Sequence, residues 1–481
     1  MKCHNINVDT IRVKWQIVTM TSWAPKLEPA VEPIYLALVE ALHRDVEAGR
    51  LPPGTRLPTQ RQLASRLRIA IGTVSRAYTI AEQRGIVRGE VGRGTFVRRD
   101  DPSYREGADE SEDAGIIDLS RGRLVRPPDD PTLSHTLKLL SQRKDLHQLV
   151  DIYQPPHGTM RHRAAAASWL KRWGLDAEPE RVVITSGAQH GAAVLLASMV
   201  RPGDLILTEE VTYSGITALA RLLQLRVQGL RMDQDGLLPA ELEAACRSSS
   251  PRALFCMSTL QNPTGRTMPL ERRREIADIV QHHRLTVLED DVNGYLPAEP
   301  LPPIAAFAPD HTFYITGTSK SLAPGLRIGY IVSPAAEVHR VSATMQATTW
   351  FTAPLMAEIV TQWIESGRAD QMAEWKRVET GARHRLARQI LGPWLPASGP
   401  VSFHLWMQLP DPWRAENFVS QARARGVVVN SPDEFLVGRE TAPHAVRVCL
   451  GGGMSREKLE DGLKRLAEML RTPPGLSAIV Y

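Results

Sequence analysis

The sequence has little of several features that would place the chain in a special class. Its 481 residues include four cysteines, and their scattered positions exclude a paired zinc motif or a dense disulfide framework. No apolar run approaches the ~18–20 residues that a membrane-spanning helix needs. The first residues also lack the apolar core of a signal peptide. These absences predict a cytoplasmic protein with no membrane segment and no metal site.

What is present is an ordinary globular composition with a mildly basic charge. Hydrophobic residues make up 43% and charged residues 23% of the chain, and the net charge is +5. This length predicts about two to four domains. A small positive excess is compatible with nucleic-acid binding without establishing it.

Shifts in composition divide the chain into five zones. A compact, arginine-rich zone is followed by a charged stretch almost free of large apolar residues, which predicts a flexible linker. A long zone of alternating strand-like and helical segments comes next. The predicted boundaries are an extension over 1–25, a first domain over 26–99, a linker over 100–115, a second domain over 116–472 and a tail over 473–481.

The first domain has the pattern of three helices and two short strands. Apolar residues at helical spacing predict that the first helix has one buried face, formed by Ile34, Leu38, Leu42 and Val46. After the break LPPGTRLP, Thr59 can cap a second helix. A third helix would bury Val74, Ala77, Tyr78 and Ala81. The segment RGIVRGEVGRGTFV then predicts two strands around a glycine turn.

The polar face of the third helix has the composition of a helix that enters the major groove of DNA. Residues 26–98 hold 12 Lys or Arg against 7 Asp or Glu, an excess suited to phosphate contact. The alternative is a small interaction module with solvated arginines. The candidate DNA contacts are Arg61, Thr73, Ser75, Arg76, Arg93 and Gly94.

The whole string, from LPPGTRLP through the helix pair to GRGTFV, resembles the GntR-type winged helix-turn-helix. One departure concerns the start of the recognition helix. That family often has Ser-Arg where this chain has Ala70 and Ile71. A capping hydroxyl and a base- or phosphate-contacting arginine are missing there, so the operator sequence cannot be carried over from relatives.

The second domain has apolar runs that end in small or polar residues, which predicts an α/β fold with a mainly parallel sheet. The runs are RVVITSG, DLILTEE, ALFCMST, LTVLEDD and TFYITGT. Because ligands of open α/β sheets gather at the carboxyl ends of the strands, these endings are the candidate site.

Each ending offers one chemical group. Gly187, Ala188 and Gln189 begin a helix whose free amides suit a phosphate. Tyr213 could stack on a flat ring, and Asn262 could donate to a ligand oxygen. The next endings add two more groups. Asp290 could keep a heterocyclic nitrogen protonated, and Lys320 could form a Schiff base with an aldehyde. Taken singly, each has an ordinary interpretation: a turn, a packed tyrosine, a strand-end cap or a metal pair, a solvated lysine.

The ordered set, with Arg327 seven residues after Lys320, resembles fold-type I pyridoxal phosphate enzymes of the aminotransferase class over residues 116–472. Joined to the first domain, it resembles the MocR family of transcriptional regulators. The resemblance implies that Lys320 forms the internal aldimine and that Asp290 pairs with the pyridine nitrogen. It also implies that Asn262 and Tyr213 contact the cofactor ring and that Arg447 binds the carboxylate of the effector. The phosphate would go to Gly187, Ala188, Gln189, Ser319 and Arg327.

Two positions depart from the aminotransferase pattern. Asn293 stands where a tyrosine often bonds the ring hydroxyl, and Gly317 stands where a serine or threonine often bonds the phosphate. A lost hydrogen bond to a charged group costs about 1.5–3 kcal/mol, so these departures could weaken cofactor binding.

The leading hypothesis is a pyridoxal phosphate-dependent transcription factor, a homodimer that binds a double-stranded DNA operator. It would sense an amino acid or related amine through an external aldimine. One alternative is a working aminotransferase with an accessory DNA-binding domain, in which Lys320 also moves protons. A second alternative is a DNA-binding protein whose cofactor site is vestigial, suggested by Gly317 and Asn293.

Overall fold

The computed structural model describes residues 23–25, 33–52, 54–83, 86–90, 94–97, 115–122, 127, 130–438, 442–451 and 453–472. The chain forms two compact units: Met1–Gly107 with Arg439–Thr441, and Ala108–Gly438 with Ala442–Tyr481. The predicted linker, tail and N-terminal extension lie almost wholly outside the described residues. The predicted boundaries at 99, 116 and 472 therefore stay predictions.

The first unit contains the three helices and two strands that its pattern predicts. They are α1 (Ile34–Glu47), α2 (Gln60–Leu67), α3 (Ile71–Gln83) and the antiparallel pair β1 (Val87–Glu90) and β2 (Gly94–Val97). Thr59 caps α2 as expected: its hydroxyl accepts from the amide of Gln62 at 3.3 Å, and Gln62 Oε1 accepts from the amide of Thr59 at 3.0 Å.

The core of this unit follows the predicted helix faces except at the two ends of α1, where Val46 is half-buried and Ile34 is exposed. The predicted face of α3 is buried, as are Leu38 and Leu42 of α1. The prediction for Ile34 was wrong, because its side chain is 49% exposed. Ile34 is the first residue of α1, where no preceding turn covers the side chain.

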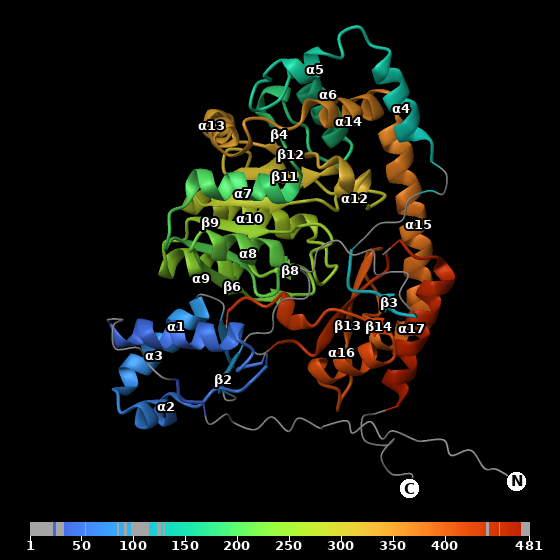
Figure 1. Ribbon diagram of the computed structural model, residues 1–481. Coiled ribbons are helices and arrows are strands. Elements are labelled where there is room, and N and C mark those ends of the chain that lie inside the picture. Colours follow the sequence, from blue (N-terminus) through green and yellow to red (C-terminus); the bar gives the residue numbers. More distant parts are fainter. Residues whose placement is uncertain are drawn as a thin grey trace, which may run out of the picture. The chain divides into compact units, whose positions relative to one another are not determined.

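The second unit is built on a seven-stranded, mainly parallel sheet (Figure 1). The neighbours β11, β10, β9, β5 and β6 are parallel, whereas β12 is antiparallel to β11 and β4. The sheet order is β4 (Val182–Thr185), β12 (Gly329–Val332), β11 (Thr312–Gly317), β10 (Thr286–Asp290), β9 (Ala253–Cys256), β5 (Leu205–Glu209) and β6 (Arg226–Leu230). All five predicted runs are strands of this sheet.

Helices cover both faces, which explains why most strands, apart from the edge strand β6, are buried along their length. One face packs against α7 (Ala188–Met199), α8 (Ser214–Leu222) and α13 (Val338–Thr349). The other packs against α6 (Met160–Lys171), α9 (Pro239–Ser248), α10 (Leu270–His283), α11 (Ile304–Phe307) and α14 (Pro354–Glu365). Shorter elements complete this part: α4 (Thr132–Ser141), α5 (Gln148–Asp151), α12 (Thr318–Ser321), β7 (Met232–Asp233) and β8 (Gly236–Leu237).

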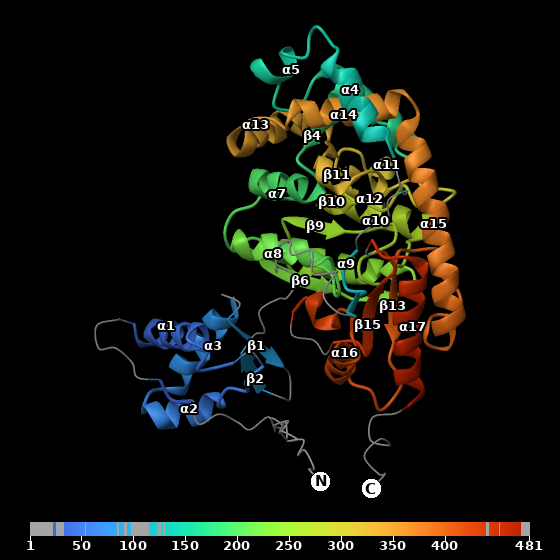
Figure 2. The same ribbon diagram turned by 45° about the vertical axis from the view of Figure 1, so that its right-hand side comes forward.

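The C-terminal part of the unit forms a second, smaller layer with its own core. It contains β3 (Ile117–Asp118), β13 (His404–Gln408), β14 (Val427–Val428), β15 (Ala445–Cys449), α16 (Ala415–Ala424) and α17 (Arg456–Arg471). The long helix α15 (Arg368–Leu391) runs from beside α14 to beside α17 and joins this layer to the large sheet (Figure 2). Among the described helices, none combines the length and the apolar character that crossing a bilayer requires.

Candidate functional site

The carboxyl ends of β4 and β11 meet the amino end of the antiparallel strand β12 at one edge of the large sheet. The register places Gly329, the first residue of β12, between Gly317 at the end of β11 and Thr185 at the end of β4. Helix α7 begins directly above this point, after Gly187, whose φ of +91° favours glycine.

Glycines let the start of α7 approach the sheet closely. A Cβ on Gly329 would lie 2.6 Å from the carbonyl carbon of Gly187 and 2.7 Å from the amide nitrogen of Ala188. A Cβ on Gly317 would lie 3.3 Å from the same Ala188 nitrogen. Side chains at these positions would therefore displace the first amides of α7. Because those amides precede the helical hydrogen-bond pattern, they are free to bind an anion.

A guanidinium lies beside the start of α7. A Cβ on Gly187 would lie 2.6 Å from Nη2 of Arg327, and Arg327 donates to Ser319 Oγ at 3.4 Å and to the carbonyl oxygen of Ser186 at 3.3 Å. Gln189 Nε2 donates to Gly215 O at 3.1 Å, which ties the start of α7 to α8. Two buried atoms here, Gln189 Oε1 and His190 Nε2, have no hydrogen-bond partner among the described residues.

Lys320 projects from the short helix α12 toward the N-terminal part of the same unit. Its Nζ donates to the carbonyl oxygen of Gly122 at 2.6 Å and lies 5.5 Å from the ring centroid of Phe403. Burial lowers the pKa of Lys320, and the Arg447 charge adds to this effect. A lowered pKa increases the fraction of neutral amine, which is the nucleophilic form.

Asp290 ends β10 among other buried carboxyl groups. Burial raises the pKa of Asp290 to about 7, and the neighbouring charges of Asp291 and Glu209 act in the same direction. Glu209, at the end of β5, also has its pKa raised by burial to about 7. Its oxygens accept from the amide of Met257 at 2.8 Å and from the hydroxyl of Thr212 at 2.9 Å. A cationic ring nitrogen would stabilise the ionised form of Asp290.

Among the described residues, Arg447 donates only to neutral oxygens. It donates to Asn262 Oδ1 at 2.7 Å, to Asn430 Oδ1 at 2.8 Å and to the carbonyl oxygen of Ser120 at 2.9 Å. Its guanidinium lies 4.5 Å from the ring centroid of Phe435. Within the described part of the chain, no carboxylate lies at ion-pair distance from Arg447. The arginine therefore keeps a charge that a ligand carboxylate can use.

Tyr213 precedes α8 and faces the same charges. Burial and Asp290 raise the pKa of its hydroxyl to about 12, while Arg327 and Arg447 oppose the shift. A Cβ on Gly215 would lie 2.3 Å from the Tyr213 ring. The charges of Asp290, Arg327 and Arg447 therefore all act on the Tyr213 hydroxyl.

Several residues of the site have no signal in the sequence. The carbonyl oxygen of Gly122, the ring of Phe403 and the amide of Asn430 come from segments far from the motifs. Asn293, predicted as a departure, donates from Nδ2 to the carbonyl oxygen of Leu260 at 2.9 Å. It therefore holds the chain just before the Asn262 turn. At Gly317, the other departure, a Cβ would lie tightly against Ala188, at 3.3 Å from its amide nitrogen.

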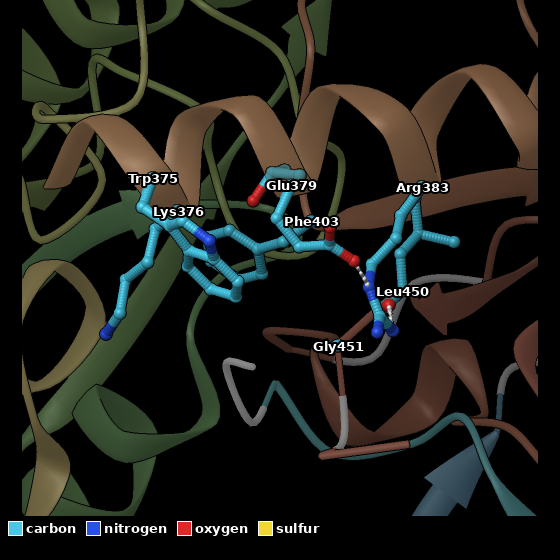
Figure 3. Close-up of a pocket in the computed structure, with 8 residues that line it drawn as sticks. Trp375, Lys376, Glu379, Arg383, Phe403, Leu450 and Gly451 are labelled. Atoms are coloured by element: carbon cyan, nitrogen blue, oxygen red, sulfur yellow. Dashed lines mark hydrogen bonds and ion pairs between the residues drawn. The ribbon is translucent and has the colours of Figure 1, made fainter. Parts of the chain in front are cut away.

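Helix α15 carries a buried lysine that holds the Lys320 segment. Lys376 is 2% exposed, and its Nζ donates to the carbonyl oxygens of Lys320, at 3.2 Å, and Leu322. Figure 3 shows Lys376 and Arg383 on α15, lining a pocket with Phe403 and Leu450. The pocket adjoins the Lys320 segment, since Phe403 contributes to both.

The candidate DNA contacts lie on α2, α3 and β2 of the first unit. Arg61 and Arg76 are exposed, and Thr73 and Ser75 are half-buried. The Arg76 guanidinium carbon lies 4.3 Å from the ring centroid of Tyr35 on α1. Gly94 has a φ of +119°, and a Cβ there would lie 3.0 Å from Arg56 Nε, so this glycine shapes the turn. Arg93 lies outside the described residues.

Comparisons with known proteins agree with both units. Residues 34–97 match the family described as bacterial regulatory proteins, gntR family, and residues 114–466 match aminotransferase class I and II. The chain is 31% identical over 449 residues to YdeF of Bacillus subtilis, an uncharacterized HTH-type transcriptional regulator, covering 93% of this chain and 97% of that one. This chain belongs to the MocR-type family of transcriptional regulators.

Two further comparisons concern parts of this regulator. It is 29% identical over 318 residues to the pyridoxine biosynthesis transcriptional regulator PdxR of Corynebacterium glutamicum, covering 64% of this chain and 68% of that one. An archaeal alanine:glyoxylate aminotransferase has the same fold, with a TM-score of 0.69 and 22% identity, over 75% of this chain and 92% of that one. The MocR-type regulators bind DNA through the GntR-type unit and use pyridoxal 5'-phosphate.

The residues present fit this cofactor. The glycine-lined start of α7, with Arg327 beside it, suits a phosphate dianion. The Lys320 amine suits an aldehyde, and the buried carboxyl of Asp290 suits a pyridine nitrogen. The two unpartnered buried atoms of Gln189 and His190 mark the same end of the site as polar.

The glycine packing predicts a specific loss of cofactor binding in Gly329→Ala. The added Cβ would meet backbone atoms that cannot rotate away, so the first amides of α7 must move. One lost hydrogen bond to a charged group, about 1.5–3 kcal/mol, would raise the cofactor Kd roughly tenfold or more. The Kd is measured by fluorescence titration of the full chain. Gly325→Ala, where a Cβ meets nothing within 4 Å, is the matched control and should bind normally. Equal affinity of both variants would contradict the packing argument.

The raised pKa of Asp290 predicts opposite effects on stability and on cofactor binding in Asp290→Asn. A folded pKa of about 7, above the ordinary 3.8, means that Asp290 stabilises the cofactor-free fold at low pH. That contribution is lost as the pH rises from about 4 through 7. The variant should therefore have the higher Tm at pH 8, a similar Tm at pH 4, and weaker cofactor binding.

Thermal unfolding of cofactor-free protein at both pH values measures the stability effect. The exposed Asp310→Asn serves as a control that should change neither Tm nor cofactor affinity. A lower Tm for Asp290→Asn at pH 8 would show that the buried carboxylate is not a source of strain.

Proposed function

We propose that the regulator changes its affinity for DNA when a primary amine that carries a carboxylate, most simply an amino acid, binds in the second unit. The observation that carries this proposal is the charge of Arg447, which pairs with no carboxylate among the described residues. Arg447 and Lys320 donate to the same short segment, to the carbonyl oxygens of Ser120 and Gly122. Its target, DNA, is the reason we place the protein in the cytoplasm.

Pyridoxal phosphate, when bound, supplies an aldehyde that condenses with amines and a ring that withdraws electrons. Lys320 offers the amine of the resting protein, held by the carbonyl oxygen of Gly122. An effector amine competes with Lys320, and its carboxylate replaces one or more of the neutral oxygens around Arg447. When the carboxylate replaces Asn262 Oδ1, the hydrogen bond from Arg447 to Asn262 is lost. Effector binding thereby changes the contacts of the Asn262 turn.

Effector binding and DNA binding influence each other reciprocally. If the effector changes the Kd for DNA by a certain factor, DNA changes the Kd for the effector by the same factor. Such factors are typically about 5–150-fold. The size is limited by the difference in effector affinity between the two conformations.

Arg447→Ala should abolish the response to amino acids while the cofactor stays bound. The full chain is loaded with pyridoxal phosphate, and its visible absorbance and its Kd for a duplex enriched from a random-sequence library are followed during amino acid titration. Arg388→Ala is the matched control, because the hydrogen bonds of Arg388 to described residues go to the carbonyl oxygens of Pro396 and Ala397. A normal response in Arg447→Ala would mean that the effector is held elsewhere.

One observation favours a second function, catalysis of amino group transfer. The lowered pKa of Lys320 suits a residue that accepts and returns a proton during such a reaction. Sustained keto-acid formation from an amino acid panel, without any effect on DNA affinity, would favour this alternative. Slow or absent turnover with a clear change in DNA affinity would favour regulation.

We also propose that the second unit forms a homodimer. Large apolar side chains are exposed close together after α5 and before α14. Tyr153 is 78% exposed, and its ring lies 5.8 Å from Trp350 and 6.0 Å from Phe351. Val150 and Ile152 are exposed beside it. A cluster of this kind marks a protein–protein contact more strongly than single exposed residues do.

Tyr153→Glu should therefore weaken self-association. A charge placed on each side of a symmetric apolar contact would raise the dimer Kd roughly 100-fold, measured by sedimentation velocity. Leu222→Glu is the matched control, because Leu222 is 75% exposed on α8, away from this cluster. Unchanged association of Tyr153→Glu, or a loss in both variants, would contradict the assignment of this face.

A further inference from the structure

The first turn of the recognition helix α3 presents an uncharged, mostly apolar surface. Ala70, Ile71 and Gly72 are all exposed, and the Ile71 side chain is 50% exposed. A Cβ on Gly72 would meet nothing within 4 Å, so no packing within the unit requires a glycine there. The opposite face, with Val74 and Ala77, is fully buried and fixes the orientation of the helix.

Exposed cationic side chains occur on the same pair of helices. Arg61 on α2, Arg68 at the end of α2 and Arg76 on α3 are exposed. Phosphate contacts from such arginines position a protein on the duplex without reading its sequence. The sequence must then be read by groups nearer the groove floor, and in a helix-turn-helix these lie at the N-terminal end of the recognition helix.

The residues at that end limit what can be read. None of Ala70, Ile71 and Gly72 has a side chain that can form a hydrogen bond, so base edges opposite them can be recognised only through apolar contact. In the major groove the thymine 5-methyl group is the apolar feature that distinguishes base pairs. The small side chains on either side of Ile71 let the helix approach closely enough for such a contact.

We propose that Ile71 is a specificity-determining residue that contacts the 5-methyl group of a thymine in the major groove of the operator. The proposal rests on the DNA-binding function of the first unit and adds a base preference to it. Thr73, half-buried in the same turn, and the exposed Arg76 supply the neighbouring polar contacts.

The test compares thymine with deoxyuridine, which differ only in the methyl group. The duplex enriched by the full-length protein from a random-sequence library is remade with deoxyuridine at each thymine in turn, and Kd values are measured. At one thymine per half-site, loss of the methyl should raise the Kd of the natural protein about fourfold, the value of one buried methyl group. Ile71→Ala should bind both duplexes with nearly the same Kd.

Arg76→Ala is the matched control. It should weaken binding to the thymine and deoxyuridine duplexes by the same factor and so leave their ratio near fourfold. The proposal is overturned if no thymine in the enriched duplex depends on its methyl group. It is also overturned if Ile71→Ala keeps the fourfold ratio. Failure to enrich any sequence would overturn the DNA-binding function together with this proposal. A similar Tm for Ile71→Ala and the natural protein shows that the variant is folded.

Discussion

The close approach of α7 to the ends of β4, β11 and β12 is the constraint on which the second unit's site depends. Gly187, Gly317 and Gly329 make that approach possible, because a side chain at any of them would meet Arg327 or the first residues of α7. Once the start of α7 is fixed there, Arg327 lies beside its first amides. Arg327 also donates to Ser319 Oγ and to the carbonyl oxygen of Ser186. The close packing against Ala188 accounts for glycine at position 317, where aminotransferases often have serine or threonine.

A second constraint connects this place to the smaller layer. Three cations on α15 bind backbone carbonyl oxygens in three separate loops. Lys376 holds the Lys320 segment, Arg377 donates to the carbonyl oxygen of Tyr295 at 2.8 Å, and Arg383 donates to that of Leu450 at 3.0 Å. These loops follow Lys320, Asp290 and Arg447 in the chain. One helix therefore holds the segments that would contact the cofactor and the effector.

The sequence predicted the strands of the large sheet and the candidate site residues that follow their carboxyl ends. The five apolar runs, the start of α7 and the order from Gly187 to Arg327 were predictable because a parallel sheet brings its carboxyl ends together. Lys376 was not predictable: a lysine within a long polar helix has the pattern of a solvated residue, and only the packing of α15 buries it. Likewise, the pattern places Arg76 on the polar face but gives no sign of its stacking on Tyr35.

The spacing of the Lys376 and Arg383 hydrogen bonds along α15 limits how the segments that they hold can move. Lys376 and Arg383 are seven residues apart, which is about 10 Å along a helix that rises ~1.5 Å per residue. A helix neither stretches nor shortens appreciably, so it keeps the two loops at a fixed separation along its axis. If both hydrogen bonds persist when an effector reaches Arg447, the Lys320 segment and the loop after Arg447 keep their separation along α15.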